Sequence, residues 1–487
     1  MSLKAEAVKG VKWTSLSFIT DVVTNFLVLA VMARLLNPED FGLIAMVLIV
    51  IGFGDVFVDA GISNALIHFQ KITVKELSSL YWFSIFLGVA CSLTVFFSAG
   101  SVNRFLGAQD IESLLQVSSI YFILVAVGLQ YRVLMQKELM FKQFTVYEIC
   151  GLIVGRIVAV CCGFLGFGAL SLIIGHLVTV ALRSFFYVYK GRRIFSLKLY
   201  FNLKCLGKYL VFGLYQLGAR ILNFIGARVD QLLIGKYLGS SRLGYYTQAT
   251  ELTRYSYIKI NPIISSVLFP VFAKIQDNTD AMNRAYLKML RLLCYLSFPL
   301  LVGLITLTTP FVEVMYSSKW LPIVPVMRVF ALVCIFNAFL NPFAVTVLLA
   351  QGRVKIGFYW ELGMTVLKIV LTVWGVTHSL LFLSWTYFGM AACTFVISYF
   401  IYFRYMLHTR LWDFLVTFFK PLSVSMLMGL AILCVNMFAW QHSLIHLCTG
   451  IFAGVLSYIF LLYLFERELV LKLIAVARRK AAFSEIL

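Results

Sequence analysis

Long apolar runs, separated by short polar connections, occupy most of the chain. A helix needs about 20 mostly apolar residues to cross the hydrocarbon core, because every backbone polar group there must find its partner within the protein. The sequence contains fourteen such runs, and we predict an all-α polytopic membrane protein with fourteen transmembrane helices. The predicted spans are 13–34, 41–67, 79–99, 112–134, 146–166, 169–189, 209–236, 243–270, 286–309, 321–349, 354–376, 379–406, 414–439 and 443–465.

Composition supports a membrane protein rather than a soluble one. Of 487 residues, 61% are hydrophobic and 13% are charged. In soluble proteins about a quarter of the residues are charged. The first run, 13–34, is too long for the apolar core of a signal peptide and contains no small-residue cleavage site. The cysteines have no metal-ligand spacing. We therefore expect a first spanning helix, and neither disulfides nor a metal site.

The distribution of basic residues predicts the orientation. The formal net charge is +20, which in a soluble protein would suggest a nucleic-acid partner. Most of the basic residues instead fall in the connections on the N-terminal side, as the positive-inside bias predicts. The opposite connections carry only Arg34, Arg104, Lys236, Arg242 and Lys319. We predict that both termini are cytoplasmic and that nucleic acid is not a partner.

A weak internal repeat predicts two related halves. At an offset of 202, segment 34–42 resembles segment 236–244: a helix ends in a basic residue, turns, and restarts just before a glycine. Such repeats occur in transporters that rock one half against the other around a central site. Chance similarity among apolar helices is the alternative. The predicted parts are an N-lobe, a C-lobe and a C-terminal region with the last two spans and a tail, at residues 1–195, 196–410 and 411–487.

Charged residues within the spans predict a polar interior. A charged side chain at mid-bilayer costs about 2.5–3.5 kcal/mol on the insertion scale, so a helix that faces lipid rarely carries one. Helical spacing places Ser17 and Asp21 on one face of span one, and Arg220 and Asn223 on one face of span seven. Similar polar faces occur on spans two and eight. We expect spans one, two, seven and eight to line most of a shared, water-accessible cavity.

Basic residues in spans seven and eight predict a net positive pocket, with only Asp230 and Glu251 available there to neutralise them. Arginine suits bidentate recognition of phosphate and carboxylate groups. We therefore expect the pocket to bind an anion, either a diphosphate or an acidic sugar. The candidate substrate-binding residues are Arg220, Arg228, Arg254, Lys259, Arg156, Arg183 and Arg328.

Acidic residues in the spans are candidates for binding a coupling ion. Asp55 and Asp59 lie one helical turn apart, so they can hold a cation between them or favour protonation of each other. The candidate coupling-ion residues are Asp21, Asp55, Asp59 and Glu251, with Na⁺ or H⁺ as the ion and no other cofactor. Pairing of these acids with the arginines is the alternative. For Glu148, Glu361 and Lys368 we favour buried ion pairs, and of the histidines only His176 is expected to face the interior.

Five segments carry a resemblance to a known family. They are KGVKWTS at 9–15, ARLLNPEDFGLIAM at 33–46, LYWFSIFLGV at 80–89, YRVLMQKELMF at 131–141 and NPIISSVLFPVFAKIQD at 261–277. Together they resemble bacterial polysaccharide-transporter flippases of the Wzx type, in particular the colanic-acid-exporter subgroup. These proteins belong to the multidrug/oligosaccharidyl-lipid/polysaccharide superfamily. The likeness covers about the first 410 residues, and it transfers no individual functional residue.

The resemblance implies a function in the bacterial inner membrane. Family members have two six-helix lobes around a cationic cavity and move an undecaprenyl-diphosphate-linked oligosaccharide from the cytoplasmic to the periplasmic leaflet by alternating access. It further implies contact with membrane lipid, and a groove for the lipid tail at the last two spans, as in the related lipid II flippases. A polysaccharide polymerase and a chain-length regulator are candidate protein partners.

Three other functions compete with this interpretation. A multidrug or other small-molecule exporter of the same superfamily should have a more apolar or acidic cavity. A polyprenyl-dependent glycosyltransferase or polymerase would use acids such as Glu39 and Asp40, but the chain lacks a large outer loop, and these residues are better explained as a helix cap. A membrane scaffold would leave the intramembrane charges without a role. We therefore expect a transporter and not an enzyme.

Overall fold

The computed structural model describes most of the chain as helices. The described residues are 3–69, 72–108, 110–193, 195, 197–258, 279–340, 354–437 and 442–467. Within these ranges there is no strand, and 13 helices are long and apolar enough to cross a membrane. Each overlaps one predicted span, and the eighth predicted span, 243–270, has no counterpart among them. The eighth span and the tenth, 321–349, lie partly outside the described residues. The chain is an all-α, multi-pass membrane protein.

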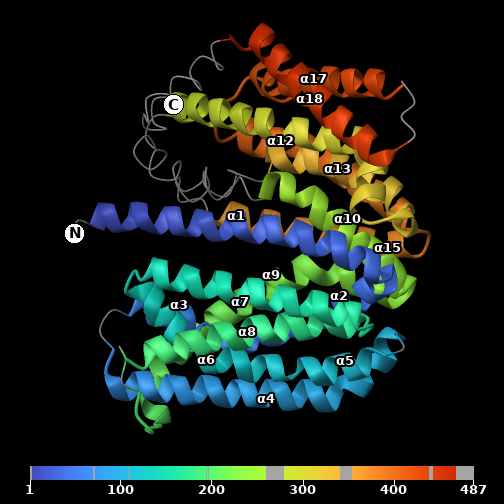
Figure 1. Ribbon diagram of the computed structural model, residues 1–487. Helices are drawn as coiled ribbons and strands as arrows, with labels where there is room; N and C mark the ends of the chain where they lie inside the picture. The colour runs from blue at the N-terminus through green and yellow to red at the C-terminus, as the bar shows by residue number, and fades with distance from the viewer. Residues whose placement is uncertain are drawn as a thin grey trace. The chain divides into compact units, whose positions relative to one another are not determined.

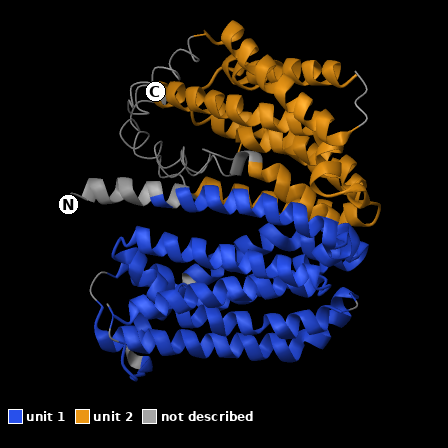
Figure 2. Ribbon diagram, viewed as in Figure 1, with its two compact units in different colours: residues 1–244 blue, residues 245–487 orange. Residues whose placement is uncertain are grey.

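The chain divides into two compact units, residues 1–244 and 245–487 (Figure 2). Unit 1 therefore holds the first seven predicted spans, one more than the predicted N-lobe of residues 1–195. The division into lobes at 195 and 410 stays a prediction. The elements of unit 1 are α1 (Leu3–Leu35), α2 (Pro38–Asp59), α3 (Ile62–His68), α4 (Val74–Leu106), α5 (Ile111–Ser118), α6 (Ile120–Lys137), α7 (Phe141–Phe164), α8 (Ala169–Gly191), η1 (Leu203–Leu206) and α9 (Gly207–Leu238) (Figure 1).

Unit 2 is built around α12. This helix packs against α13, α17 and α18, and α16 packs against α13 and α15. Phenylalanine rings fill the core, as between Phe395 and Phe418, whose centroids lie 4.6 Å apart. Helix α10 (Ser240–Ile258) begins in unit 1 and continues in unit 2. The other elements of unit 2 are α12 (Thr279–Met315), η2 (Ser318–Trp320), α13 (Ile323–Leu340), α15 (Val354–Val376), α16 (Leu380–Ser398), η3 (Tyr399–Arg404), α17 (Leu411–Asn436) and α18 (Ser443–Phe465).

The acidic turn before α2 is a structural cap. Asn37 is the N-cap, Pro38 is the first helical residue, and the Asp40 carboxylate accepts the backbone N–H of Asn37 at 2.8 Å. Its other oxygen accepts the backbone N–H of Ala169, at the start of α8, at 3.1 Å. One carboxylate thus satisfies otherwise unpaired donors at the starts of two helices. The predicted cap is confirmed.

The two repeats meet through a reciprocal contact at the starts of α2 and α10. A Cβ added to Gly42 would lie 1.8 Å from the backbone oxygen of Ser240, and one added to Gly244 would lie 1.9 Å from the backbone oxygen of Pro38. The offset of 202 converts Pro38 into Ser240 and Gly42 into Gly244, so each contact is the image of the other. A reciprocal contact of this kind is what a local pseudo-two-fold relation between segments 34–42 and 236–244 would produce, and the repeat itself stays a prediction.

The second predicted span, 41–67, is not one continuous helix. Ala60 and Gly61 both have left-handed backbone angles, with φ of 42° and 72°, and they separate α2 from α3. The Asp59 carboxylate accepts the backbone N–H of Ser63 at 3.1 Å, which satisfies a donor at the start of α3. Interrupted helices are tolerated in membranes where protein or water satisfies the freed backbone groups. The break therefore places polar groups within the second predicted span.

Candidate functional site

Close packing of α7 against α8 positions the charged residues of the site (Figure 1). A Cβ added to Gly155 would lie 1.9 Å from the Thr179 hydroxyl oxygen and 2.4 Å from the backbone oxygen of Gly175. One added to Gly175 would lie 2.5 Å from the Cβ of Ala159. Small residues at such spacing allow membrane helices to approach closely. Because α1 packs against α7 as well, α7 presents side chains to a helix on each side.

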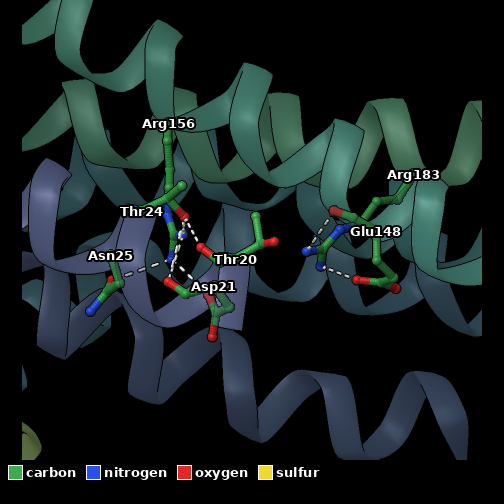
Figure 3. A network of polar contacts seen from close by, with 7 residues as sticks. All are labelled: Thr20, Asp21, Thr24, Asn25, Glu148, Arg156 and Arg183. Carbon is green, nitrogen blue, oxygen red and sulfur yellow. Dashed lines mark hydrogen bonds and ion pairs between the residues drawn. The ribbon is translucent and has the colours of Figure 1, made fainter. Parts of the chain in front are cut away.

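Arg156 of α7 binds α1 through a dense polar network (Figure 3). Its Nη1 donates to the backbone oxygen of Asp21 at 3.0 Å and to the hydroxyl of Thr24. Its Nη2 donates to the Asp21 carboxylate at 2.8 Å and to the Asn25 side-chain oxygen at 3.3 Å. The alternative in which Asp21 pairs with an arginine is therefore what the structure contains.

Arg183 of α8 forms a second ion pair, with Glu148 of α7 (Figure 3). Its Nη1 lies 2.9 Å from a Glu148 carboxylate oxygen, and its Nη2 donates to the Glu148 backbone oxygen at 3.4 Å. The Tyr187 hydroxyl donates to the other carboxylate oxygen at 2.5 Å. The ion pair expected for Glu148 is thus present with Arg183 as its partner, but it is partly exposed rather than buried.

Both ion pairs line one cavity of about 620 Å³ among α1, α7 and α8. A volume of this size is typical of small-molecule sites. The lining contains two acids and two arginines, so its formal charge is balanced when His176 is neutral. Its apolar part includes Phe18, Val28, Leu152 and Leu172, and its polar residues are Ser17, Asp21, Asn25, Glu148, Arg156, His176, Thr179 and Arg183.

His176 connects this cavity to Asp55. The imidazole stacks on the Tyr121 ring, with centroids 5.3 Å apart, and the Tyr121 hydroxyl lies 3.4 Å from an Asp55 carboxylate oxygen. His176 lines the cavity, as expected from its position in the sequence. Asp55 and Asp59 have different partners despite lying one turn apart, and a cation held between them stays a prediction.

A separate polar cluster surrounds the break between α2 and α3. Arg220 of α9 forms an ion pair with the buried Asp59, whose carboxylate also accepts the Ser63 hydroxyl. The Asn64 amide donates to the Gln216 side-chain oxygen at 3.4 Å. The expectation that only Asp230 and Glu251 neutralise the basic residues of spans seven and eight is wrong, because α2 packs against α9 and brings Asp59 to Arg220.

The other predicted site residues lie on exposed helix surfaces or outside the described residues. Arg228 of α9 is exposed and donates to the Gln231 side chain at 2.8 Å. On α10, Glu251 and Arg254 are both exposed. Arg328 of α13 is exposed and donates to the Thr309 hydroxyl at 3.2 Å. Lys259 lies outside the described residues. The net positive pocket expected from these residues stays a prediction.

The helices that line the described cavity differ from those expected. Of spans one, two, seven and eight, only span one contributes, as α1, and the other walls are α7 and α8, which are spans five and six. The sequence contains a signal for this: Gly151, Gly155, Ala159 and Gly163 repeat at intervals of four residues on α7. That spacing is typical of closely packed membrane helices. It indicates a buried face next to Arg156.

Two solved structures share the fold of this chain. The lipid II flippase MurJ in an inward closed conformation matches with a TM-score of 0.76 and 18% identity, over 94% of this chain and 100% of that chain. An inward-facing multidrug resistance transporter of the MATE family matches with a TM-score of 0.51 and 14% identity, over 93% of this chain and 98% of that one. The chain therefore has the all-helical fold of these flippases and exporters.

Sequence similarity assigns the chain to a family. A family model described as polysaccharide biosynthesis protein matches residues 31–325, and the chain belongs to this family. TuaB of Bacillus subtilis, a teichuronic acid biosynthesis protein, is 29% identical over 95% of this chain and 96% of its own length. WzxC of Escherichia coli, a lipopolysaccharide biosynthesis protein, is 29% identical over 88% and 87%. ExoT of Rhizobium meliloti, a succinoglycan biosynthesis transport protein, is 25% identical over 97% and 96%.

Proposed function

We propose that this protein is a flippase that moves an undecaprenyl-diphosphate-linked oligosaccharide from the cytoplasmic to the periplasmic leaflet of a bacterial inner membrane. The observation that carries the proposal is similarity, over nearly the whole chain, to proteins named for polysaccharide and lipopolysaccharide biosynthesis. The fold shared with a lipid II flippase supports it. The charged cavity in unit 1 supports it further, because a glycan headgroup can cross the hydrocarbon only where polar groups replace its water.

The proposed transport cycle is alternating access, in which the two halves rock around a central site. Arg220, Arg228, Arg254, Lys259, Arg156, Arg183 and Arg328 are the proposed ligands for the diphosphate or for acidic sugars. Asp21, Asp55, Asp59 and Glu251 are the proposed residues for a coupling Na⁺ or H⁺. In the structure Asp21 pairs with Arg156 and Asp59 pairs with Arg220. These pairs support a coupling ion, because a cation that binds the acid would release the arginine to bind an anion.

The proposed membrane orientation and partners follow from the charge distribution and from the substrate. Both termini are cytoplasmic in this proposal, because most basic residues fall in the connections on that side. The substrate arrives on a membrane lipid, so the lipid bilayer is a partner throughout the cycle. A polysaccharide polymerase and a chain-length regulator are the proposed proteins that use the translocated repeat unit.

A flipping assay tests the proposed function. The purified full chain is reconstituted into liposomes that contain an undecaprenyl-diphosphate-linked oligosaccharide in both leaflets. Periodate, which does not cross the bilayer, then oxidises the accessible glycans. Protein-free liposomes should protect the inner-leaflet glycan, whereas the flippase should expose it.

The same assay separates the competing functions. The variant Arg228→Gln, at an exposed position of α9, should weaken flipping while it incorporates at normal levels. Persistent protection of the inner leaflet by wild-type protein that is folded and incorporated into the liposomes would overturn the proposal. Efflux of a fluorescent cationic drug without glycan flipping would favour a multidrug exporter instead.

A further inference from the structure

The connection between α8 and α9 alternates apolar and polar residues. Every odd-numbered position from 195 to 203 is apolar, and the segment 190–208 holds six basic residues and no acidic one. The side chains of Phe195 and Leu197 pack against a buried cluster of tyrosine and methionine side chains from α6 and α8. The first two apolar positions of the connection thus belong to the core of unit 1.

The next three apolar positions are exposed. Leu199, Phe201 and Leu203 are 91%, 52% and 59% exposed, whereas Tyr200 and Asn202 between them are partly buried. The Tyr200 N–H donates to the backbone oxygen two residues earlier at 2.8 Å, which closes a tight turn. At this turn the apolar positions pass from the core of unit 1 to its surface.

Hydrogen bonds attach the connection to the first turns of α4 (Figure 1). The Ser78 hydroxyl accepts the backbone N–H of Lys198 at 2.9 Å, and the Ser79 hydroxyl accepts that of Asn202 at 3.1 Å. The Trp82 indole N–H donates to the Lys198 backbone oxygen at 3.2 Å. Both serine residues are fully buried. The exposed apolar side chains therefore belong to a segment that is fixed on α4.

The attachment point determines the depth of the connection in the membrane. The third predicted span is 79–99, so Trp82 lies near the edge of the hydrocarbon, where tryptophan is enriched. At this edge, apolar side chains can enter the acyl region while basic side chains reach the headgroups. Arg192, Arg193 and Lys198 are exposed on the same connection. Anionic lipid headgroups are complementary in charge to this basic segment.

We propose that residues 197–206 form an interfacial anchor, which binds the lipid leaflet on the side of the basic connections, the cytoplasmic side in the proposed orientation. Leu199, Phe201 and Leu203 enter the acyl region at the edge of the leaflet, and the neighbouring basic residues bind anionic phospholipid headgroups. The anchor ends where α9 begins, at Gly207, so it ties to the lipid the joint between the sixth and seventh predicted spans. The inference goes beyond the proposed function, because it depends on no glycan substrate.

Fluorescence from a single position tests the insertion. The full chain is reconstituted into nanodiscs of phosphatidylcholine and phosphatidylglycerol, with the fluorescent amino acid Anap introduced at position 201 through a reassigned stop codon. Lipids that carry a nitroxide at the top of the acyl chain should quench its emission, and aqueous iodide should quench it little. Glu138, an exposed residue of the connection after α6, is the matched control position on the same side, and Anap there should show the reverse pattern.

Two results would overturn the anchor. Iodide quenching as strong at position 201 as at position 138 would place the segment in water. Protection of position 201 from iodide and from nitroxide lipids alike would show that protein covers the segment. With Anap at position 201, Leu199→Ser/Leu203→Ser should lower the quenching by nitroxide lipids and raise that by iodide, because two of the three inserted side chains are then polar.

Lipid composition tests the role of charge. Nanodiscs without phosphatidylglycerol should show weaker nitroxide quenching at position 201, and so should Arg192→Gln/Lys198→Gln in nanodiscs that contain it. Arg104→Gln, at the opposite end of α4, is the matched control and should leave the quenching unchanged. Quenching that depends neither on lipid charge nor on these two basic residues would overturn the binding of anionic headgroups.

The fluorescence measurement involves no transport, so the anchor and the proposed function can fail separately. A protein that flips no glycan lipid but shows the expected quenching would keep the anchor and lose the proposed function. A protein that flips glycan lipid while position 201 is open to iodide would keep the function and lose the anchor.

Discussion

Replacement of Gly155 by alanine should loosen the contact between α7 and α8 and displace the ion pairs of the cavity. The new Cβ would lie 1.9 Å from the hydroxyl of Thr179 and 2.4 Å from the backbone oxygen of Gly175, far inside van der Waals contact. Overpacking of this kind typically costs about 1–3 kcal/mol, and the higher helix propensity of alanine offsets up to about 1 kcal/mol of it. We expect a net loss of about 1–2 kcal/mol.

Thermal unfolding in detergent, followed by size-exclusion chromatography, measures this loss. Gly218→Ala on α9 is the matched control, because nothing lies within 4 Å of its added Cβ, and it should be neutral or slightly stabilising. Thr179→Ala should rescue Gly155→Ala only in part, since it removes the hydroxyl but leaves the backbone oxygen of Gly175. A Gly155→Ala protein as stable as Gly218→Ala would refute the close contact inferred for the two helices.

Three further variants test other contacts by the same unfolding measurement. Arg220→Gln should lower the stability by about 1–3 kcal/mol, because it leaves the buried Asp59 without its ion pair. The double variant Asp59→Asn/Arg220→Gln should recover most of that stability. A double variant as unstable as Arg220→Gln would contradict the pairing. Gly42→Ala and Gly244→Ala should each destabilise by about 1–3 kcal/mol and by similar amounts, since their contacts are reciprocal. Glu466→Gln should cost about 1–2 kcal/mol, because that carboxylate joins α18 to α12 and α17; an unchanged midpoint would argue against this link.

Hydrophobic runs were sufficient to predict the helical fold, because the length of an apolar run directly reports a span. The break at Ala60 and Gly61 was missed, since a run that stays apolar gives no sign of an interruption. Its cause is local: Asp59 satisfies a donor of α3 with its own carboxylate, and Gly61 tolerates a positive φ. An acidic residue two positions before a glycine inside an apolar run, as with Asp59 and Gly61, is the sequence feature that marks this break.

The charged residues could be named from the sequence, but their partners could not. Asp21 and Arg156 come from spans one and five, and only the packing of α1 against α7 brings them together. Spacing within one helix favoured a joint role for Asp55 and Asp59, yet their partners lie on different helices, α6 and α9. Helical periodicity reports which residues share a face. It does not report which helix that face meets.

The balanced charge of the unit 1 cavity bears on how such a site can work in a membrane. A guanidinium without an anion in a poorly hydrated cavity would carry a desolvation cost of several kcal/mol, so an empty site lined by Arg156 and Arg183 alone would be unstable. Asp21 and Glu148 remove that cost while the cavity holds no ligand. A ligand that bound these arginines would have to supply anionic groups in place of the two carboxylates. In the described structure Asp21 and Glu148 balance the two arginines within unit 1, so the cavity needs no external anion to offset the charge of Arg156 and Arg183.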